Sequence, residues 1–137
     1  ARHKFGGNLS YRGFDGKGYQ VRDILHVHDL YELLKKQLAD LESTTNTIYN
    51  VGGGPSTSVS LAELTSQCHR ISSEHLEIGS DLETSSSDIP YYVTDNSTVS
   101  NIFDWVPKQD IEFILDDIFR WLTDHQRVLQ PFFRDRI

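Results

Sequence analysis

The stretch that decides the fold is residues 19–42, YQVRDILHVHDLYELLKKQLADLE. Its first part, residues 19–27, is rich in β-branched and aromatic side chains, which predicts a strand, although the apolar positions do not alternate cleanly. Asp29 then stands where a helix N-cap is expected, and Glu32 follows three residues later, as in a capping box. The leucines recur at helical spacing, at positions 30, 33, 34, 38 and 41. The stretch therefore predicts a strand followed directly by an amphipathic helix that ends near Glu42.

Helices and short strands alternate along the rest of the chain. Further strands are predicted at residues 9–11, 47–51, 75–78 and 89–93. Ser60 and Glu63 predict a second capping box, which opens a helix through Cys68. Later helices are predicted over 95–103 and 111–122, the latter with a single apolar stripe, and the basic, aromatic tail after His125 is expected to fray. The fold class is therefore a small mixed α/β lobe, and 137 residues allow one domain.

Composition and charge exclude several classes of function. Thirteen basic residues against twenty acidic ones give a net charge of −7, which argues against a nucleic-acid partner. The longest apolar runs are two or three residues, so no membrane partner is expected. The single cysteine excludes an internal disulfide and indicates a reducing, cytoplasmic location. The chain contains no methionine, which favours a piece of a longer protein.

The three glycines at 52–54 follow a predicted strand, as a phosphate-binding loop would. A dinucleotide fingerprint beginning at Gly52 requires a sixth-position glycine, but that position is Thr57. Two interpretations remain open for these glycines: tight turns, or a close backbone approach to a ligand.

Two other clusters have structural explanations that are stronger than chemical ones. His26, His28 and Asp29 form a minimal ligand set, but a capped helix start accounts for Asp29, so no metal is predicted. Cys68 and His69 are neighbours on a predicted helix and point about 100° apart, so they do not form a nucleophile and base pair. Cys68 is expected to belong to the core.

Arg22 is a charged residue among the apolar residues of a predicted strand, so its guanidinium is expected to have a specific partner. Its guanidinium either pairs with Asp23 or faces a groove and binds a phosphate with two hydrogen bonds. Residue chemistry alone leaves these two interpretations equal.

Five segments of the chain resemble those of a known family. Residues 16–30, GKGYQVRDILHVHDL, resemble the segment that opens the C-terminal half of extended short-chain dehydrogenase/reductase enzymes acting on nucleotide sugars. Four further segments that resemble the family follow in the family's order. They are IYNVGGG at 48–54, SVSLAEL at 58–64, DIPYYVTDNS at 88–97, and DWVP at 104–107 with the helix after it. The residues at 16–23 are most similar to the branch of the CDP-tyvelose and CDP-paratose 2-epimerases.

The resemblance implies a function for a parent protein rather than for this chain alone. It implies NAD-dependent 2- or 4-epimerisation, or 4,6-dehydration, of a nucleotide-diphosphate sugar, in which NAD borrows and returns a hydride. The family's glycine fingerprint, its Tyr-x-x-x-Lys pair and its catalytic Ser/Thr lie in an N-terminal Rossmann domain that is absent here. We therefore expect residues 1–137 to be the C-terminal substrate-binding lobe, with no catalytic or cofactor-binding residue of its own.

Three residues match positions that bind substrate in the family. Arg22 matches the arginine that contacts the diphosphate, Tyr11 lies where the nucleotide pocket is lined, and Tyr92 matches an aromatic position near the sugar. The family's second arginine is missing, because residues 84–87 read TSSS. The alternative is accordingly a decayed, non-catalytic copy or a stand-alone interaction module. The exposed leucines expected on residues 30–41 also favour a homo-oligomer.

Overall fold

The computed structural model describes residues 1–44 and 47–134, and it divides into two compact units. The first unit contains residues 1–20, 60–90 and the chain from residue 112, and the second contains residues 21–59 and 91–111. Helices and short strands are mixed in both units, so the predicted mixed α/β class is confirmed. Among the described residues, every helix is too short or too polar to span a bilayer.

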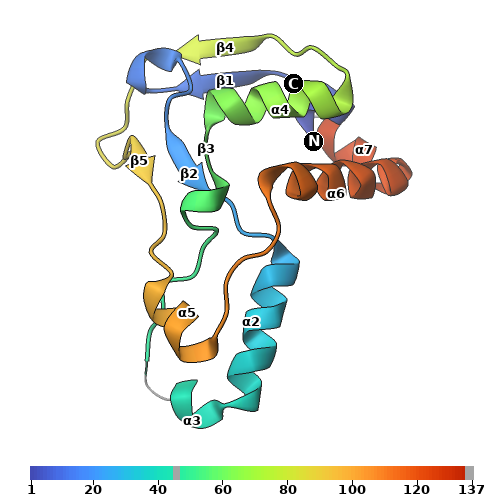
Figure 1. The fold of residues 1–137 in the computed structure, drawn as a ribbon. Helices are drawn as coiled ribbons and strands as arrows, with labels where there is room; N and C mark the ends of the chain where they lie inside the picture. The colour runs from blue at the N-terminus through green and yellow to red at the C-terminus, as the bar shows by residue number, and fades with distance from the viewer. Residues whose placement is uncertain (45–46, 135–137) are drawn as a thin grey trace. The chain divides into compact units, whose positions relative to one another are not determined.

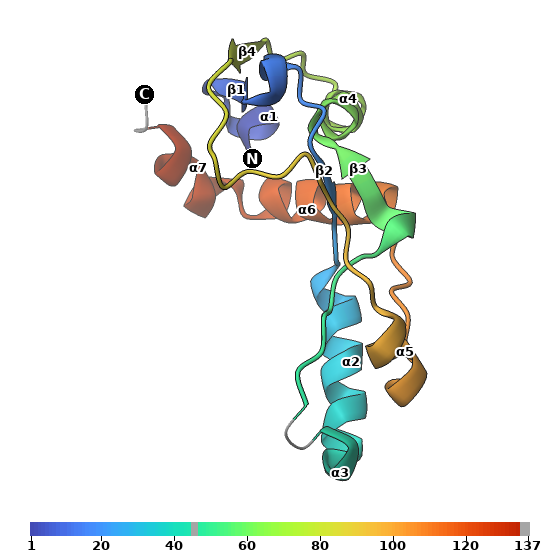
Figure 2. The same cartoon turned by 90° about the vertical axis from the view of Figure 1, so that its left-hand side faces the viewer.

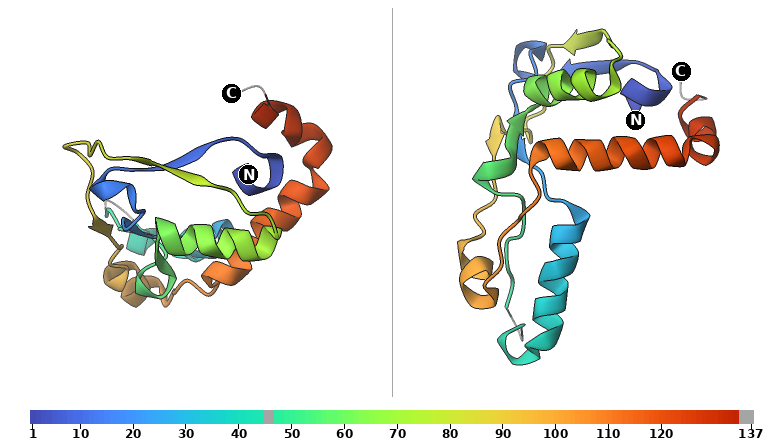
Figure 3. Two further views of the ribbon diagram at one scale, coloured as in Figure 1. Left: turned by 90° about the horizontal axis from the view of Figure 1, so that it is seen from above. Right: turned by 45° about the vertical axis from the view of Figure 1, so that its right-hand side comes forward.

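The first unit is built on a two-stranded parallel sheet. Strand β1 (Leu9–Arg12) pairs with β4 (Ile78–Asp81), and the register places Leu9 opposite Ile78. Helix α4 runs above α6 in the view of Figure 1, and Figure 3 shows it beside the pair of strands. The helical elements of the unit are α1 (Arg2–Phe5), the 3₁₀ turn η1 (Phe14–Gly16), α4 (Leu61–Ser72), α6 (Ile111–Asp124, all but its first residue) and α7 (Gln126–Arg134).

The start of α4 confirms the second predicted capping box. The Ser60 hydroxyl accepts a hydrogen bond from the Glu63 N–H at 3.2 Å, and the Glu63 carboxylate accepts one from the Ser60 N–H at 2.9 Å. Two N–H groups that the first turn leaves without helical partners are thereby satisfied.

The second unit is built on three short strands in the order β3-β2-β5. Strands β2 (Val21–Asp23) and β5 (Tyr91–Tyr92) are parallel. Helix α5 packs beside α2, which Figures 1 and 2 show. The remaining elements of this unit are α2 (Val27–Ala39), α3 (Leu41–Thr44), the 3₁₀ turn η2 (Pro55–Thr57), β3 (Ser58–Ser60, whose last residue falls in the first unit) and α5 (Ser97–Phe103).

The core of the second unit lies between α2 and α5. Its buried side chains are Leu33, Val99, Phe103 and Trp105, of which Leu33 is 1 % exposed and Val99 is completely covered. The Trp105 indole N–H donates to the Asp29 carbonyl at 3.0 Å, so the polar end of this buried ring is also satisfied.

The predicted start of α2 is wrong by three residues. His26, not Asp29, is the N-cap, and its Nδ1 accepts a hydrogen bond from the His28 N–H at 3.1 Å. Asp29 lies inside the first turn and is 3 % exposed, and its carboxylate accepts from the Gln109 N–H at 3.0 Å. A tertiary contact with a distant segment therefore uses the carboxylate that the local pattern assigned to the cap.

Three further predictions about secondary structure are wrong. The strand predicted at residues 75–78 lies later in the chain, as β4 at 78–81. Residues 47–51 carry no strand, although Tyr49 and Val51 pack against the core of the second unit. The tail after His125 is predicted to fray, but residues 126–134 form α7, where the Phe133 ring stacks on Phe5 at 5.2 Å between centroids, and residues 135–137 lie outside the described residues. Apolar packing accounts for the last two of these differences. Tyr49 and Val51 are partly buried without pairing as a strand, and the packing of apolar side chains against another segment stabilises the helix of the tail.

Candidate functional site

Arg22 and Tyr92, two of the three predicted binding residues, lie opposite each other on neighbouring strands. The register of β2 and β5 pairs Val21 with Tyr91 and Arg22 with Tyr92. Directly paired residues project from the same face of a sheet, so this fold places a guanidinium and a phenol side by side. Tyr92 is 52 % exposed and Arg22 is half-buried. One face of a small sheet therefore offers a cation and an aromatic ring.

The Arg22 guanidinium is oriented by its own strand. Its Nη1 donates a hydrogen bond to the Val21 carbonyl oxygen at 2.7 Å. Because the guanidinium is planar, fixing one of its branches also limits where the other N–H groups point. This preorganisation suits an arginine that binds an anion.

Asp23, the next residue on β2, is hydrogen-bonded to the glycine loop. Its Oδ2 accepts a hydrogen bond from the Gly54 N–H at 2.8 Å, and Thr94 bonds it as well. Burial by itself raises the pKa of Asp23, but the hydrogen bonds from Gly54 and Thr94 outweigh it and hold that pKa below its usual value. Successive strand residues project from opposite faces, so Asp23 points away from the Arg22–Tyr92 face.

The three glycines at 52–54 approach the protein's own chain. A Cβ on Gly52 would collide with the side chains of Asp23 and Thr94, and one on Gly53 would collide with the Ile24 carbonyl. Gly54 has a φ of +72°, a left-handed conformation that glycine adopts without steric cost. The left-handed Gly54 and the 3₁₀ turn η2 that follows it fit the tight-turn interpretation. The close approaches at Gly52 and Gly53 are made to the protein itself, and an approach to a ligand stays a prediction.

Asn96 joins the same loop from the other side. Its Oδ1 accepts from the Gly52 N–H at 3.0 Å, and its Nδ2 donates to the Gly52 carbonyl at 2.8 Å. Asp23, Thr94 and Asn96 thus connect β2, the glycine loop and the segment after β5. We name these hydrogen-bonded residues, together with Gly52 and Gly54, the glycine-loop clamp.

Tyr11, the third predicted binding residue, belongs to the first unit. It lies half-buried on β1, and its ring packs against Gly18, where an added Cβ would be 2.9 Å from the ring. Gly18 has a φ of +71°. Arg22 and Tyr92 are therefore paired within the second unit, whereas Tyr11 belongs to the first unit.

The segment in place of the second arginine also lies in the first unit. The Thr84 hydroxyl accepts a hydrogen bond from the Phe14 N–H at 2.9 Å, and the hydroxyls of Ser85 and Ser87 are 2.9 Å apart. Thr84 therefore binds the turn after β1, and residues 84–87 contain no cationic side chain.

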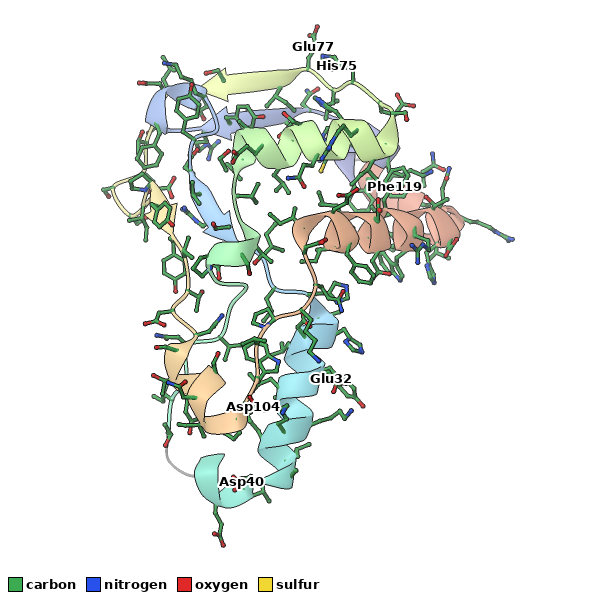
Figure 4. The ribbon with its side chains drawn as sticks, viewed as in Figure 1. Glu32, Asp40, His75, Glu77, Asp104 and Phe119 are labelled. Carbon is green, nitrogen blue, oxygen red and sulfur yellow. The ribbon has the colours of Figure 1, made fainter. Side chains whose placement is uncertain are left out.

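The two clusters that the sequence interpreted structurally have structural roles here. His26 caps α2 and Asp29 binds Gln109, as described above, and within residues 1–44 and 47–134 no group of three ligating side chains could hold a metal ion. Cys68 is half-buried and lines a mainly apolar cavity of the first unit with Ile71, Leu115 and Phe119, the last labelled in Figure 4. Burial raises the pKa of the Cys68 thiol, which disfavours the nucleophilic thiolate.

The chain is similar to known proteins in both sequence and fold. No family model matches the chain. CDP-paratose 2-epimerase of Salmonella typhi is 29 % identical over 111 residues, which cover 79 % of this chain and 32 % of that enzyme. The predicted resemblance is confirmed. The chain spans about a third of the length of the curated relative that it matches.

Solved structures give the same result for the fold. UDP-glucose-4-epimerase of Stenotrophomonas maltophila, solved with NAD and formylated UDP-arabinopyranose, matches 88 % of this chain with a TM-score of 0.70 at 21 % identity. The dTDP-glucose 4,6-dehydratase of Bacillus anthracis, solved with NAD, matches 85 % of it with a TM-score of 0.65 at 25 % identity. This chain covers 35 % of each of those chains, and the match falls in the C-terminal part of the epimerase structures.

Sequence reasoning missed the glycine-loop clamp. The sequence offers Asp23 as a partner for Arg22 and places Thr94 and Asn96 in a family landmark, but it does not connect the three residues to the glycines. The available signal was the triple glycine itself, since three adjacent glycines indicate that other atoms approach the backbone closely. The sequence did not show which atoms those are.

Proposed function

We propose that residues 1–137 are the C-terminal substrate-binding lobe of an NAD-dependent nucleotide-sugar epimerase or 4,6-dehydratase. The observation that carries the proposal is the register of β2 and β5, which pairs Arg22 with Tyr92 on one face. In this proposal the Arg22 guanidinium binds the diphosphate, Tyr92 lies against the sugar, and Tyr11 lines the nucleotide pocket. The similarity to CDP-paratose 2-epimerase over 79 % of the chain supports it.

The lobe binds and orients the substrate, and it does not hold the cofactor. The backbone of the glycine loop at 52–54 is closely covered by Asp23, Ile24 and Thr94, so this loop does not fit a dinucleotide. NAD is therefore assigned to another part of the parent protein. Holding a diphosphate at a fixed place relative to that part lowers the entropic cost of the reaction.

Binding measurements test this proposal directly. We expect the full-length protein that contains this chain to bind UDP, CDP or dTDP, as measured by isothermal titration calorimetry, and to bind NAD. The isolated 137-residue chain is expected to bind no NAD and to turn over no nucleotide sugar. A full-length protein that binds none of the three diphosphates would refute the proposal, and turnover by the isolated chain would refute the division of roles.

A non-catalytic copy is the second candidate, and one observation favours it. The loop at 84–87 has no arginine, and its Thr84 hydroxyl binds the turn after β1. Diphosphate affinity without epimerase or dehydratase turnover in the full-length protein would select this candidate.

A further inference from the structure

The strands that carry Arg22 and Tyr92 are too short to fix their own alignment. Strand β2 has three residues and β5 has two. A slip of one residue between paired strands moves each side chain of the slipped strand to the opposite face. Such a slip would remove Tyr92 from the face that carries Arg22, so something besides the ladder must maintain the register.

The glycine-loop clamp supplies connections on both sides of this pair. Asp23 follows Arg22 directly and binds the Gly54 N–H, while Thr94, two residues after Tyr92, bonds Asp23. Asn96 then holds both backbone groups of Gly52. The ends of β2 and β5 are thereby tied to one loop by hydrogen bonds that run between side chains and backbone.

The loop itself is too closely packed to move without disturbing these strands. Gly52 is in contact range of Asp23 and Thr94, and Gly53 of the Ile24 carbonyl. The Ile24 carbonyl in turn accepts a hydrogen bond from the Thr57 hydroxyl at 2.7 Å. A displacement of Gly52 is therefore transmitted to the segments that follow Arg22 and Tyr92.

We propose that Asn96 is a positioning residue for nucleotide-sugar binding, which acts through Gly52 to hold Arg22 and Tyr92 on the same face. This inference rests on the proposed function. Asn96 does not have to touch the ligand, because its carboxamide is already engaged at both ends by Gly52. The role is chemically specific: an acceptor and a donor on one short planar group are both required.

The test combines Asn96→Ala with Arg22→Lys in a double-mutant cycle on the full-length protein, with UDP, CDP and dTDP as probes. We expect Asn96→Ala to weaken binding of the preferred diphosphate about tenfold, and to weaken it much less when Arg22 is already Lys, because both changes disable the same contact. Asn96→Asp keeps the acceptor for the Gly52 N–H but sets a carboxylate oxygen against the Gly52 carbonyl oxygen, so the affinity is expected to fall at least as far as in Asn96→Ala. This variant also carries the test if Asn96→Ala does not fold.

Asn101→Ala is the matched control, since Asn101 is an exposed amide on the same helix segment that follows Asn96. It is expected to leave the affinity unchanged. If the wild-type protein binds a diphosphate and Asn96→Ala binds it equally well, the positioning role is wrong and the proposed function stands. Additive losses in the cycle would also overturn the role, since a general structural defect acts independently of Arg22. If the wild-type protein binds no diphosphate, the proposed function fails and this inference fails with it.

Discussion

Arg22 combines a half-buried strand position with a guanidinium that its own backbone orients. The bond from its Nη1 to the Val21 carbonyl limits the freedom that binding an anion would otherwise remove. Lysine carries the same charge but has no planar fork, so it cannot reproduce a two-bond contact with a phosphate.

Arg22→Lys is therefore expected to weaken diphosphate binding by about 1.5–3 kcal/mol, which is the range for a charge-assisted hydrogen bond, and to leave NAD binding intact. Isothermal titration calorimetry of the full-length protein measures both affinities. Arg70→Lys, an exposed change on α4, is the control. A lower melting temperature with unchanged diphosphate affinity would instead assign Arg22 a purely structural role.

Asp23 makes the stability of the protein depend on pH. The pKa of Asp23 is lower in the folded state because Gly54 and Thr94 donate hydrogen bonds that outweigh the effect of burial. A lowered folded-state pKa means that the unfolded chain binds the proton more readily. The stabilisation is then complete above the unfolded pKa of about 3.9 and is lost as the pH falls towards the folded-state pKa.

Asp23→Asn is expected to reduce the slope of unfolding free energy against pH below about pH 5, where the unfolded aspartate begins to bind its proton while the folded one, with its lowered pKa, does not. Urea denaturation at several pH values measures this slope. Asp116→Asn removes an exposed carboxylate on α6 and serves as the comparison. Equal slopes for Asp23→Asn and the wild type would contradict the hydrogen-bonded carboxylate described here.

At the scale of elements, the hydrogen bonds of turns and helix caps hold the segments together more than the short strands do. The glycine loop joins segments that the short ladder of β2 and β5 could not hold alone. Helix α4, in contrast, begins through a purely local device, the Ser60–Glu63 capping box. These two features predict different sensitivities to substitution.

Gly53→Ala is expected to destabilise the protein by about 1–3 kcal/mol, since the added methyl group would overlap the Ile24 carbonyl and the Thr57 hydroxyl. Gly79→Ala is a matched control in β4, where the nearest atom to an added Cβ is the Ser10 Cβ at 3.4 Å, an ordinary contact. Chemical denaturation of the two variants compares them. Equal stabilities would show that the loop accommodates a side chain.

Ser60→Ala is expected to cost about 1 kcal/mol, the usual effect of losing an N-cap. The control is Ser66→Ala, because the Ser66 hydroxyl only donates to the Ala62 carbonyl within the helix at 3.0 Å, a contact that does not stabilise helices. Urea unfolding curves distinguish the two. A loss at Ser66 as large as that at Ser60 would argue against a specific capping effect.

At the scale of the whole molecule, apolar side chains remain exposed on α2 and α3. Leu34, Leu38 and Leu41 are 48 %, 70 % and 62 % exposed, whereas Leu33, which the sequence grouped with them, is buried in the core. Contiguous exposed apolar surface of this kind is typical of an interface. In the proposed lobe, the rest of the parent protein would cover it.

The isolated 137-residue chain is therefore expected to self-associate and to bind the dye ANS. Leu38→Glu should lower the ANS fluorescence and shift the chain towards the monomer, as measured by analytical ultracentrifugation. Val128→Glu, at a comparably exposed apolar position on α7, should do so less. A wild-type chain that is monomeric and does not bind ANS would contradict this prediction.

The sequence by itself determined the features that depend on neighbouring residues. The Ser60–Glu63 box, the apolar stripe of the helix from Ile111 and the mixed α/β class follow from local patterns and are confirmed. The ordered landmarks also indicated the resemblance to nucleotide-sugar epimerases. Such patterns are reliable because a cap or an amphipathic stripe needs only residues within one or two helical turns.

Only the tertiary structure decided which distant groups meet. It moved the start of α2 from Asp29 to His26, left residues 47–51 without a strand, and gave the tail a helix that Phe5 supports. It also placed Tyr92 opposite Arg22 and engaged Asn96 with Gly52. The type of a residue shows whether its side chain can donate or accept a hydrogen bond. Which group it bonds depends on distant segments that only folding brings together.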